Sequence, residues 1–232
     1  MALITPRDLA MIEWIARFPF VTSHQASKWL SSIAHGSAAM RVLNRRTAAL
    51  IDAGLLADGR LLTEHGRVFW VTHEGLAAVG VTGQVHPPRI GQARHDKLVT
   101  DLALDLMISK ASHQLVTERE MRREDTRNQL PSNEPVWVTV HTSAKSRRVY
   151  PDLLTVAPSG SRVVHEVELA SKAHSRLVSL MLSHLDNDAV GGVRYYAAND
   201  ARTGVEKAAE VARQAATQRG NRKVLTVLGL PG

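Results

Sequence analysis

The sequence predicts a mixed α and β protein, α+β or α/β in class, that folds as two domains. Apolar residues recur every three to four positions in several segments, as in amphipathic helices, and elsewhere form the short runs typical of strands. A glycine- and proline-rich stretch, GVTGQVHPPRIGQAR at 80–94, has neither period and predicts a linker. We therefore expect a first domain over 1–82, a linker over 83–94 and a second domain over 95–232.

The composition predicts a cytoplasmic protein with a polyanionic partner. The 232 residues include no cysteine, which excludes disulfides and thiolate metal sites and suits a reducing compartment. Charged residues interrupt the N-terminal segment and no long apolar run occurs, so neither a signal peptide nor a membrane partner is expected. The net charge of +7 favours nucleic acid, because Lys and Arg release counterions when they neutralise phosphates.

The N-terminal segment predicts two short helices. Thr5 and Pro6 are typical of an N-cap and the first helical position, and apolar residues then recur at helical spacing up to Pro19. The segment HQASKWL at 24–30 follows, with Thr22 or Ser23 as its N-cap. Each helix has one apolar face with which to pack.

A third helix is predicted from Ser37 to Gly54, where the glycine is a natural C-terminal cap. The helical period defines an inner stripe of Met40, Leu43, Thr47, Leu50 and Ile51. The outer face then carries Arg41, Asn44 and Arg45, with Arg46 at its flank. This third helix is therefore amphipathic and basic on its exposed side.

Two short β runs, at 55–62 and 63–72, predict a hairpin before a last short helix that begins at His73. Three helices followed by a hairpin form the order of a winged helix-turn-helix domain, whose third helix enters the major groove of DNA. The expected contacts to double-stranded DNA are Ser37, Arg41, Asn44, Arg45 and Arg46 from the helix and Arg60, His65 and Arg67 from the wing. A helical bundle with solvated arginines and a protein-interaction module remain as alternatives.

Helices and strands alternate in the second domain. Before the central hairpin, the patterns predict a helix over 95–111, a strand over 113–120, a loop over 122–135 and a strand over 136–142. After it, they predict a helix over 171–185, a strand over 192–198, a helix over 204–220 and a strand over 223–230. The alanine-rich helix over 204–218 could pack on the sheet or on a second protomer of a homodimer, and we expect it on the sheet.

Three carboxylates fall on the central hairpin. Its first strand, VYPDLLTVA, carries Asp152, and its second strand, RVVHEVELA, carries Glu166 and Glu168 on one face. Carboxylates held together are costly unless they are solvated, protonated or bound to a cation, and Mg²⁺ prefers such oxygen ligands. A solvated sheet edge and a Mg²⁺ site both remain open, and Glu118 on the preceding strand could add a fourth carboxylate.

The order of these motifs resembles the core of the PD-(D/E)XK nuclease-like superfamily, a restriction-endonuclease-like α/β fold. The matching residues are Pro151-Asp152, Glu166-Val167-Glu168 and Lys172. The resemblance implies that Asp152 and Glu166 hold Mg²⁺ and that Glu168 or Lys172 lies near the attacking water. Glu168 stands where the superfamily usually has Lys, and Lys172 would then be a lysine moved towards the next helix.

Over residues 5 to about 200 the chain resembles the replication-relaxation family of actinobacterial plasmids and phages. The resemblance is carried by TPRDLAMIEWIARFPFVTSHQASKWL, HDKLVTDLALDL, VTERE, YPDLL and HEVELASK in that order. It implies a sequence-specific DNA-binding protein of a mobile element. The implied roles are transcription repression, replication control and mobilisation.

Other chemistries have no motif in the sequence. GxxxxGK[ST], GxGxxG and GxSxG are missing, so no nucleotide cofactor is expected, and the histidines lack the spacing of a zinc protease. Two main hypotheses follow. One is a DNA-binding protein whose nuclease-like domain does not cleave; the other is a Mg²⁺-dependent endonuclease or nickase. An adaptor that binds only proteins is a third.

Overall fold

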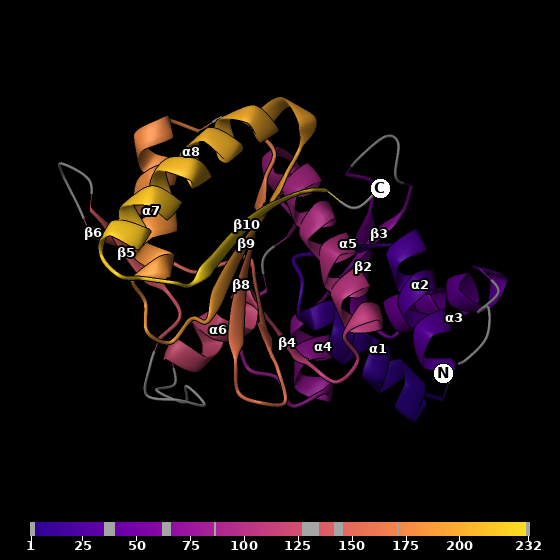
Figure 1. The fold of residues 1–232 in the computed structure, drawn as a ribbon. Helices are drawn as coiled ribbons and strands as arrows, with labels where there is room; N and C mark the ends of the chain where they lie inside the picture. Colours follow the sequence, from indigo (N-terminus) through magenta and orange to yellow (C-terminus); the bar gives the residue numbers. More distant parts are fainter. Residues whose placement is uncertain are drawn as a thin grey trace. The chain divides into compact units, whose positions relative to one another are not determined.

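The structure is a computed structural model that describes residues 3–34, 40–61, 66–85, 87–126, 135–141, 146–170 and 172–230. The chain divides into two compact units, Met1–Ile108 and Ser109–Gly232, called here the first and second units. Helices and strands occur in both, so the fold is mixed α+β as expected (Figure 1). In the described ranges, every helix is too short or too polar to cross a membrane.

The first unit begins with two capped helices that pack through aromatic rings. α1 (Pro6–Ala16) starts at Thr5, whose hydroxyl accepts from the backbone of Asp8 while the Asp8 carboxylate accepts from the Thr5 backbone. α2 (Ser23–Ala34) starts with the same reciprocal bonds between Thr22 and Gln25. The rings of Trp14 and Trp29 stack at 5.1 Å and join the two helices. Both predicted helices are confirmed.

Three short strands make the sheet of the first unit, in the antiparallel order β1-β3-β2. β2 (Leu56–Gly59) and β3 (Val68–Val71) form the expected hairpin. β1 (Val21–Thr22) was not expected as a strand, because a two-residue strand leaves no periodic signal. Thr72 caps the short helix α4 (His73–Ala78), as predicted from its position.

The third helix, α3 (Met40–Asp52), buries only part of its predicted inner stripe. Leu43, Thr47 and Leu50 are buried, but Met40 is 40% exposed and Ile51 is half-buried. The prediction for Met40 is therefore wrong, because Met40, Arg41 and Val42 are all exposed and burial along α3 begins at Leu43. The chain leaves the helix through Gly54, whose φ of 73° suits a residue without a side chain.

An ion pair between the half-buried Arg46 and the buried Asp8 joins α3 to α1. The Arg46 guanidinium donates from Nε to Asp8 Oδ1 at 2.9 Å and from Nη2 to Asp8 Oδ2, and it also reaches the carbonyl of Leu3. Burial raises the pKa of Asp8, but the hydrogen bonds from Arg46 and Thr5 outweigh it and hold that pKa below its ordinary value. Asp8 thus completes the N-terminal cap of α1 and also holds α3 against α1.

The boundary between the units differs from the expected linker at 83–94. That stretch leads through a short 3₁₀ turn, Ile90–Gln92, into α5 (Ala93–Ser109), nearly all of which belongs to the first unit. Gln25 donates to the carbonyl of Lys97 and to Asp101, and Lys28 pairs with Asp105 at 2.6 Å. The glycines and prolines indicated irregular backbone, whereas contacts with side chains of α2 place α5 in the first unit.

The second unit contains a mixed five-stranded sheet in the order β10-β9-β8-β7-β4. Its strands are β4 (Gln114–Thr117), β7 (Leu153–Val156), β8 (Arg162–Glu168), β9 (Gly192–Ala197) and β10 (Val224–Gly229). β4, β7 and β8 pair antiparallel, whereas β8, β9 and β10 pair parallel. β5 (Val138–His141) and β6 (Ser146–Val149) form a separate antiparallel pair.

Helices α7 (His174–Leu185) and α8 (Asn199–Gln218) cover one face of this sheet (Figure 1). The small side chains of α8 lie in the same core as β8 and β9, so the expectation that this helix packs on the sheet is confirmed. α8 begins five residues before the predicted start at 204, because the polar first turn carries no apolar period.

Two predicted elements between 113 and 157 are corrected. The strand expected over 113–120 ends at Thr117, where the Glu120 carboxylate accepts from the Thr117 backbone. The helix α6 (Glu118–Thr126) follows and runs from the last residues of the expected strand into the expected loop. The strand expected over 149–157 is interrupted at Tyr150–Asp152, which separates β6 from β7. Local capping and Pro151 override the apolar patterns at these points.

Loss of the Arg46 guanidinium should destabilise the first unit. Arg46→Ala leaves the Asp8 carboxylate, which is 3% exposed, without its cation. We expect the free energy of unfolding to fall by about 2–4 kcal/mol, since an uncompensated buried charge is expensive. Urea unfolding followed by tryptophan fluorescence measures this loss. Arg45→Ala removes the same charge from an exposed neighbour and should cost at most about 0.5 kcal/mol; equal losses in the two variants would contradict the role of the pair.

Candidate functional site

The outer face of α3 presents three polar side chains to solvent. Arg41 and Arg45 lie one helical turn apart and Asn44 lies beside them, all exposed as predicted. Within the described ranges, the guanidinium groups of Arg41 and Arg45 make no hydrogen bond or ion pair. Two exposed cations on one helical face can meet an anionic ligand.

The other residues predicted to contact DNA divide into three groups. Arg46 is engaged with Asp8 and so serves the packing of α3, in contrast to its predicted role. Arg67, at the start of β3, donates to Asp58 at 2.6 Å and stacks over Phe69, whereas Arg60 is exposed at the end of β2. Ser37 and His65 lie outside the described residues.

The second unit brings its three predicted carboxylates to one region of β7 and β8. Asp152 immediately precedes β7, and its Oδ2 accepts from the backbone N–H of Val167 at 2.8 Å. Glu166 and Glu168 alternate with Val167 on β8, and they are only 6% and 2% exposed. Their shared face is as predicted, but the alternative of a solvated sheet edge is wrong because α7 and α8 cover that face.

Glu166 faces a histidine that the sequence alone did not single out. Its Oε1 lies 3.2 Å from Nε2 of His184, a fully buried residue on α7. Burial raises the pKa of Glu166 well above 4.5, and the charges of Asp152 and Glu168 raise it further. Burial lowers the pKa of His184 to about 4. Both shifts act in the direction of the uncharged form of each side chain.

Glu168 and Glu118 have basic partners of their own. Lys172 donates to Glu168 Oε1 at 2.6 Å while its side chain stays 42% exposed. Glu118 is the first residue of α6 and pairs with Arg122 one turn later, so its expected place on a strand is wrong. Its backbone N–H donates to the carbonyl of Asp152, which joins α6 to the start of β7.

A Mg²⁺ ion in this region would depend on the oxygen atoms of the three carboxylates. Asp152 and Glu166, the two predicted ligands, engage the Val167 backbone and His184, and Glu168 engages Lys172. Among the described residues, no group of three or more His, Asp or Glu side chains is arranged to hold a metal ion. The three carboxylates are brought together, and a group of the protein engages one oxygen atom of each.

Tyr195 is a second residue near the carboxylates that sequence reasoning missed. It stands opposite Glu166 in the parallel register of β8 and β9, and it is fully buried. Its hydroxyl makes no hydrogen bond within the described part of the chain. Burial, and then the charges of Glu166 and Glu168, raise the pKa of Tyr195 well above 10. Only the strand register could have indicated this neighbour.

The opposite face of β8 carries a closed polar group centred on His165. Thr155 Oγ1 lies 2.9 Å from His165 Nε2, and the Tyr196 hydroxyl lies 3.2 Å from Nδ1. Burial, and then the charges of Arg194 and Lys110, lower the pKa of His165 to about 3. With both ring nitrogens bonded inside the protein, His165 contributes to the structure of the sheet.

Two neighbouring tyrosines should respond in opposite ways to loss of their hydroxyls. Tyr195→Phe removes a buried hydroxyl without a partner and should raise the Tm by about 2–4 °C, since such a group costs about 1 kcal/mol or more. Tyr196→Phe removes the partner of His165 and should lower the Tm by a similar amount. Calorimetry of the full chain measures both shifts, and a lower Tm for Tyr195→Phe would show that its hydroxyl is bonded.

The buried imidazole of His184 should make the second unit sensitive to acid. Its pKa is lowered from 6.5 to about 4, so the stability that it contributes is present above pH 6.5 and is lost as the pH falls towards 4. Between pH 7 and pH 4.5, the Tm of the natural chain should therefore fall further than that of His184→Gln. Melting curves across this range are the test; parallel curves would contradict it. The raised pKa of Glu166 has the opposite effect on stability, because protonation of Glu166 favours the folded state as the pH falls. Comparison with His184→Gln separates the effect of His184 from that of Glu166.

Comparisons with known proteins found no relative of this chain. Neither a protein-family model, nor a curated protein, nor a solved structure matches the chain. The exposed cations of α3 and the buried carboxylates of β8 are the features of the chain that bear on its function.

Proposed function

We propose that this protein is a sequence-specific double-stranded DNA-binding protein whose first unit is a winged helix-turn-helix domain. The observation that carries the proposal is the outer face of α3, with Arg41 and Arg45 exposed one turn apart and Asn44 beside them. Arginine bonds guanine or phosphate through two parallel N–H groups, and asparagine bonds adenine in the same way. These are the side chains that a recognition helix needs.

The order of elements supports the same proposal. The first unit runs α1-β1-α2-α3-β2-β3 and closes β1, β3 and β2 into one sheet, which is the order that a winged helix requires. α3 has 13 residues. It is about 20 Å long, and the major groove of DNA admits a helix of that kind. Arg60 lies at the tip of β2, where a wing contacts the DNA backbone.

The second unit is proposed to be a nuclease-like PD-(D/E)XK scaffold that does not cleave. What supports this is that Asp152, Glu166 and Glu168 each engage a group of the protein, and that Glu166 is held in a setting that favours its neutral form. A neutral carboxyl is a poor ligand for Mg²⁺. The biological role would then be repression, replication control or mobilisation of a mobile element, with the second unit adding contacts or recruitment.

DNA binding is tested by selecting a site from a random-sequence duplex library and measuring affinity by fluorescence anisotropy over a salt series. Arg41→Ala and Arg45→Ala should each weaken binding. The salt slope should fall by about 0.9 for a lost phosphate contact, or sequence choice should relax by about 1–3 kcal/mol for a lost base contact. Arg202→Ala is the control, because that guanidinium is already paired with Glu206. Unchanged affinity and slope in both α3 variants would refute the proposal.

The same protein–DNA mixtures test for cleavage. Supercoiled plasmid carrying the selected site is incubated with Mg²⁺, Mn²⁺ or EDTA, and binding and topology are observed on one gel. We expect a stable shift with intact supercoils. Nicked or linear product that disappears in Glu166→Ala would instead establish the Mg²⁺-dependent endonuclease or nickase, with Asp152, Glu166 and Glu168 or Lys172 at its site.

A further inference from the structure

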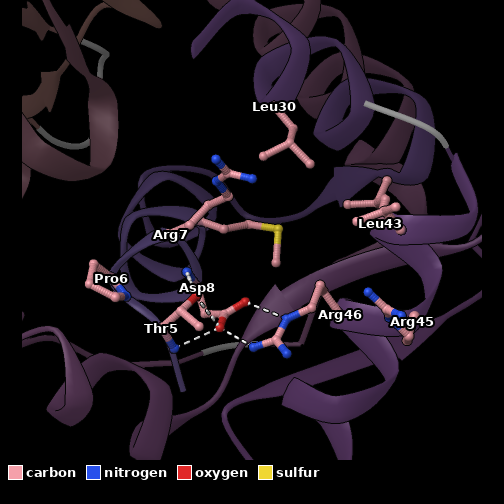
Figure 2. Close-up of a pocket in the computed structure, with 10 residues that line it drawn as sticks. Thr5, Pro6, Arg7, Asp8, Leu30, Leu43, Arg45 and Arg46 are labelled. Carbon is pink, nitrogen blue, oxygen red and sulfur yellow. Dashed lines mark hydrogen bonds and ion pairs between the residues drawn. The ribbon is translucent and has the colours of Figure 1, made fainter. Parts of the chain in front are cut away.

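The first unit contains a pocket of about 440 Å³ that the proposed DNA contacts do not fill. Figure 2 shows it between the start of α1 and α3, with Leu30 of α2 on its wall. The volume falls within the range of small-molecule sites, about 300–1,000 Å³. All ten lining residues belong to the first unit.

Apolar side chains form the body of the pocket. Met11, Leu30 and Leu43 are buried residues of three different helices, and Val42 lies beside them on the flank of α3. Such a surface favours a ligand with an apolar body, because water gains little by hydrating it. Val42 is 41% exposed, so the pocket opens to solvent there.

The charges around the pocket are predominantly positive. Arg7, Arg45 and Arg46 line it together with a single carboxylate, Asp8. Arg46 and Asp8 neutralise one another, as the dashed lines in Figure 2 indicate. Arg7 and Arg45 lie on opposite sides of the hollow in the same view, and within the described ranges neither makes a hydrogen bond or ion pair. The unbalanced charge is therefore that of two exposed guanidinium groups, which an anion would satisfy.

We propose that this pocket binds a small organic acid, with its apolar body beside Val42 in the hollow and its carboxylate between Arg7 and Arg45. The apolar part and the positively charged part of the pocket together disfavour other classes of ligand. A free phosphate would leave the apolar walls unused, an alkyl cation would meet two arginines, and duplex DNA is too wide to enter.

Occupancy of the pocket is coupled to DNA binding through Arg45, and this second step rests on the proposed function. Arg45 lines the pocket and also belongs to the outer face of α3. An acid that pairs with Arg45 withdraws that cation from DNA and adds a negative charge next to the recognition helix. The acid therefore lowers DNA affinity, and DNA lowers the affinity for the acid by the same factor.

Ligand binding is tested first, on the full chain without DNA. Octanoate, acetate, 1-octanol and octylammonium are titrated below their aggregation concentrations by isothermal calorimetry. Octanoate should bind at least about tenfold more tightly than 1-octanol and acetate, because only octanoate joins an apolar body to a charge-assisted bond. Octylammonium should bind least. Equal binding of octanoate and 1-octanol, or no octanoate binding, overturns the proposed ligand class.

Three variants locate the binding site. Arg7→Gln should weaken octanoate binding by about three- to tenfold and leave 1-octanol unchanged, since one charge-assisted bond is lost. Arg94→Gln makes the same charge change at an exposed position outside the pocket and should have no effect. Val42→Trp fills the pocket from its exposed side and should abolish binding of both ligands, with circular dichroism as the check on folding. Octanoate binding that survives both Arg7→Gln and a folded Val42→Trp places the ligand elsewhere and overturns the site.

The DNA experiment separates the two proposals. Saturating octanoate, compared with acetate at equal ionic strength, should lower the DNA affinity of the natural chain and leave that of Val42→Trp unchanged. Octanoate binding without any DNA binding refutes the proposed function and leaves the pocket in place. DNA binding without octanoate binding refutes the proposed acid site and leaves the proposed function in place. If octanoate binds but the DNA affinity does not change, the coupling between the two sites is overturned.

Discussion

The second unit depends on the pairing of β8 along both of its edges. β7 pairs with it antiparallel and β9 pairs with it parallel, so its backbone orientation is fixed and its side chains must alternate between two covered faces. That constraint carries Glu166 and Glu168 into the side packed by α7 and α8, and it places His165 on the other. The buried polar groups of this unit follow from the strand pairing, and each then needs a partner.

The partners decide what the carboxylates can do. A carboxylate near the end of a strand is a metal ligand only if its oxygen atoms are free to converge on one point. In this chain Asp152 accepts a hydrogen bond from a backbone N–H of β8, Glu166 contacts a buried histidine and Glu168 pairs with a lysine. Each of the three acidic residues of this motif therefore has a partner within the protein.

In the first unit, one ion pair divides the arginines of α3 into two kinds. Arg46 pairs with the buried Asp8 and fixes the helix against α1, whereas Arg41 and Arg45 remain exposed. The pair also forms a neutral wall of the pocket, which leaves Arg7 and Arg45 as the charges that a ligand meets. Packing of α3, the proposed DNA contacts and the proposed acid site therefore share a single helix, and Arg45 is common to the last two.

The sequence by itself determined the local elements and the face on which each candidate residue lies, because helix caps and apolar periods act over only a few residues. Thr5, Thr22 and Thr72 cap their helices as predicted, and Glu166 and Glu168 share a face. Only the tertiary structure decided that α5 joins the first unit, that Arg46 is engaged and that His184 and Tyr195 surround Glu166. Those outcomes depend on contacts between residues far apart in the sequence, such as Lys28 and Asp105, which are 77 positions apart, and a local pattern contains no information about them.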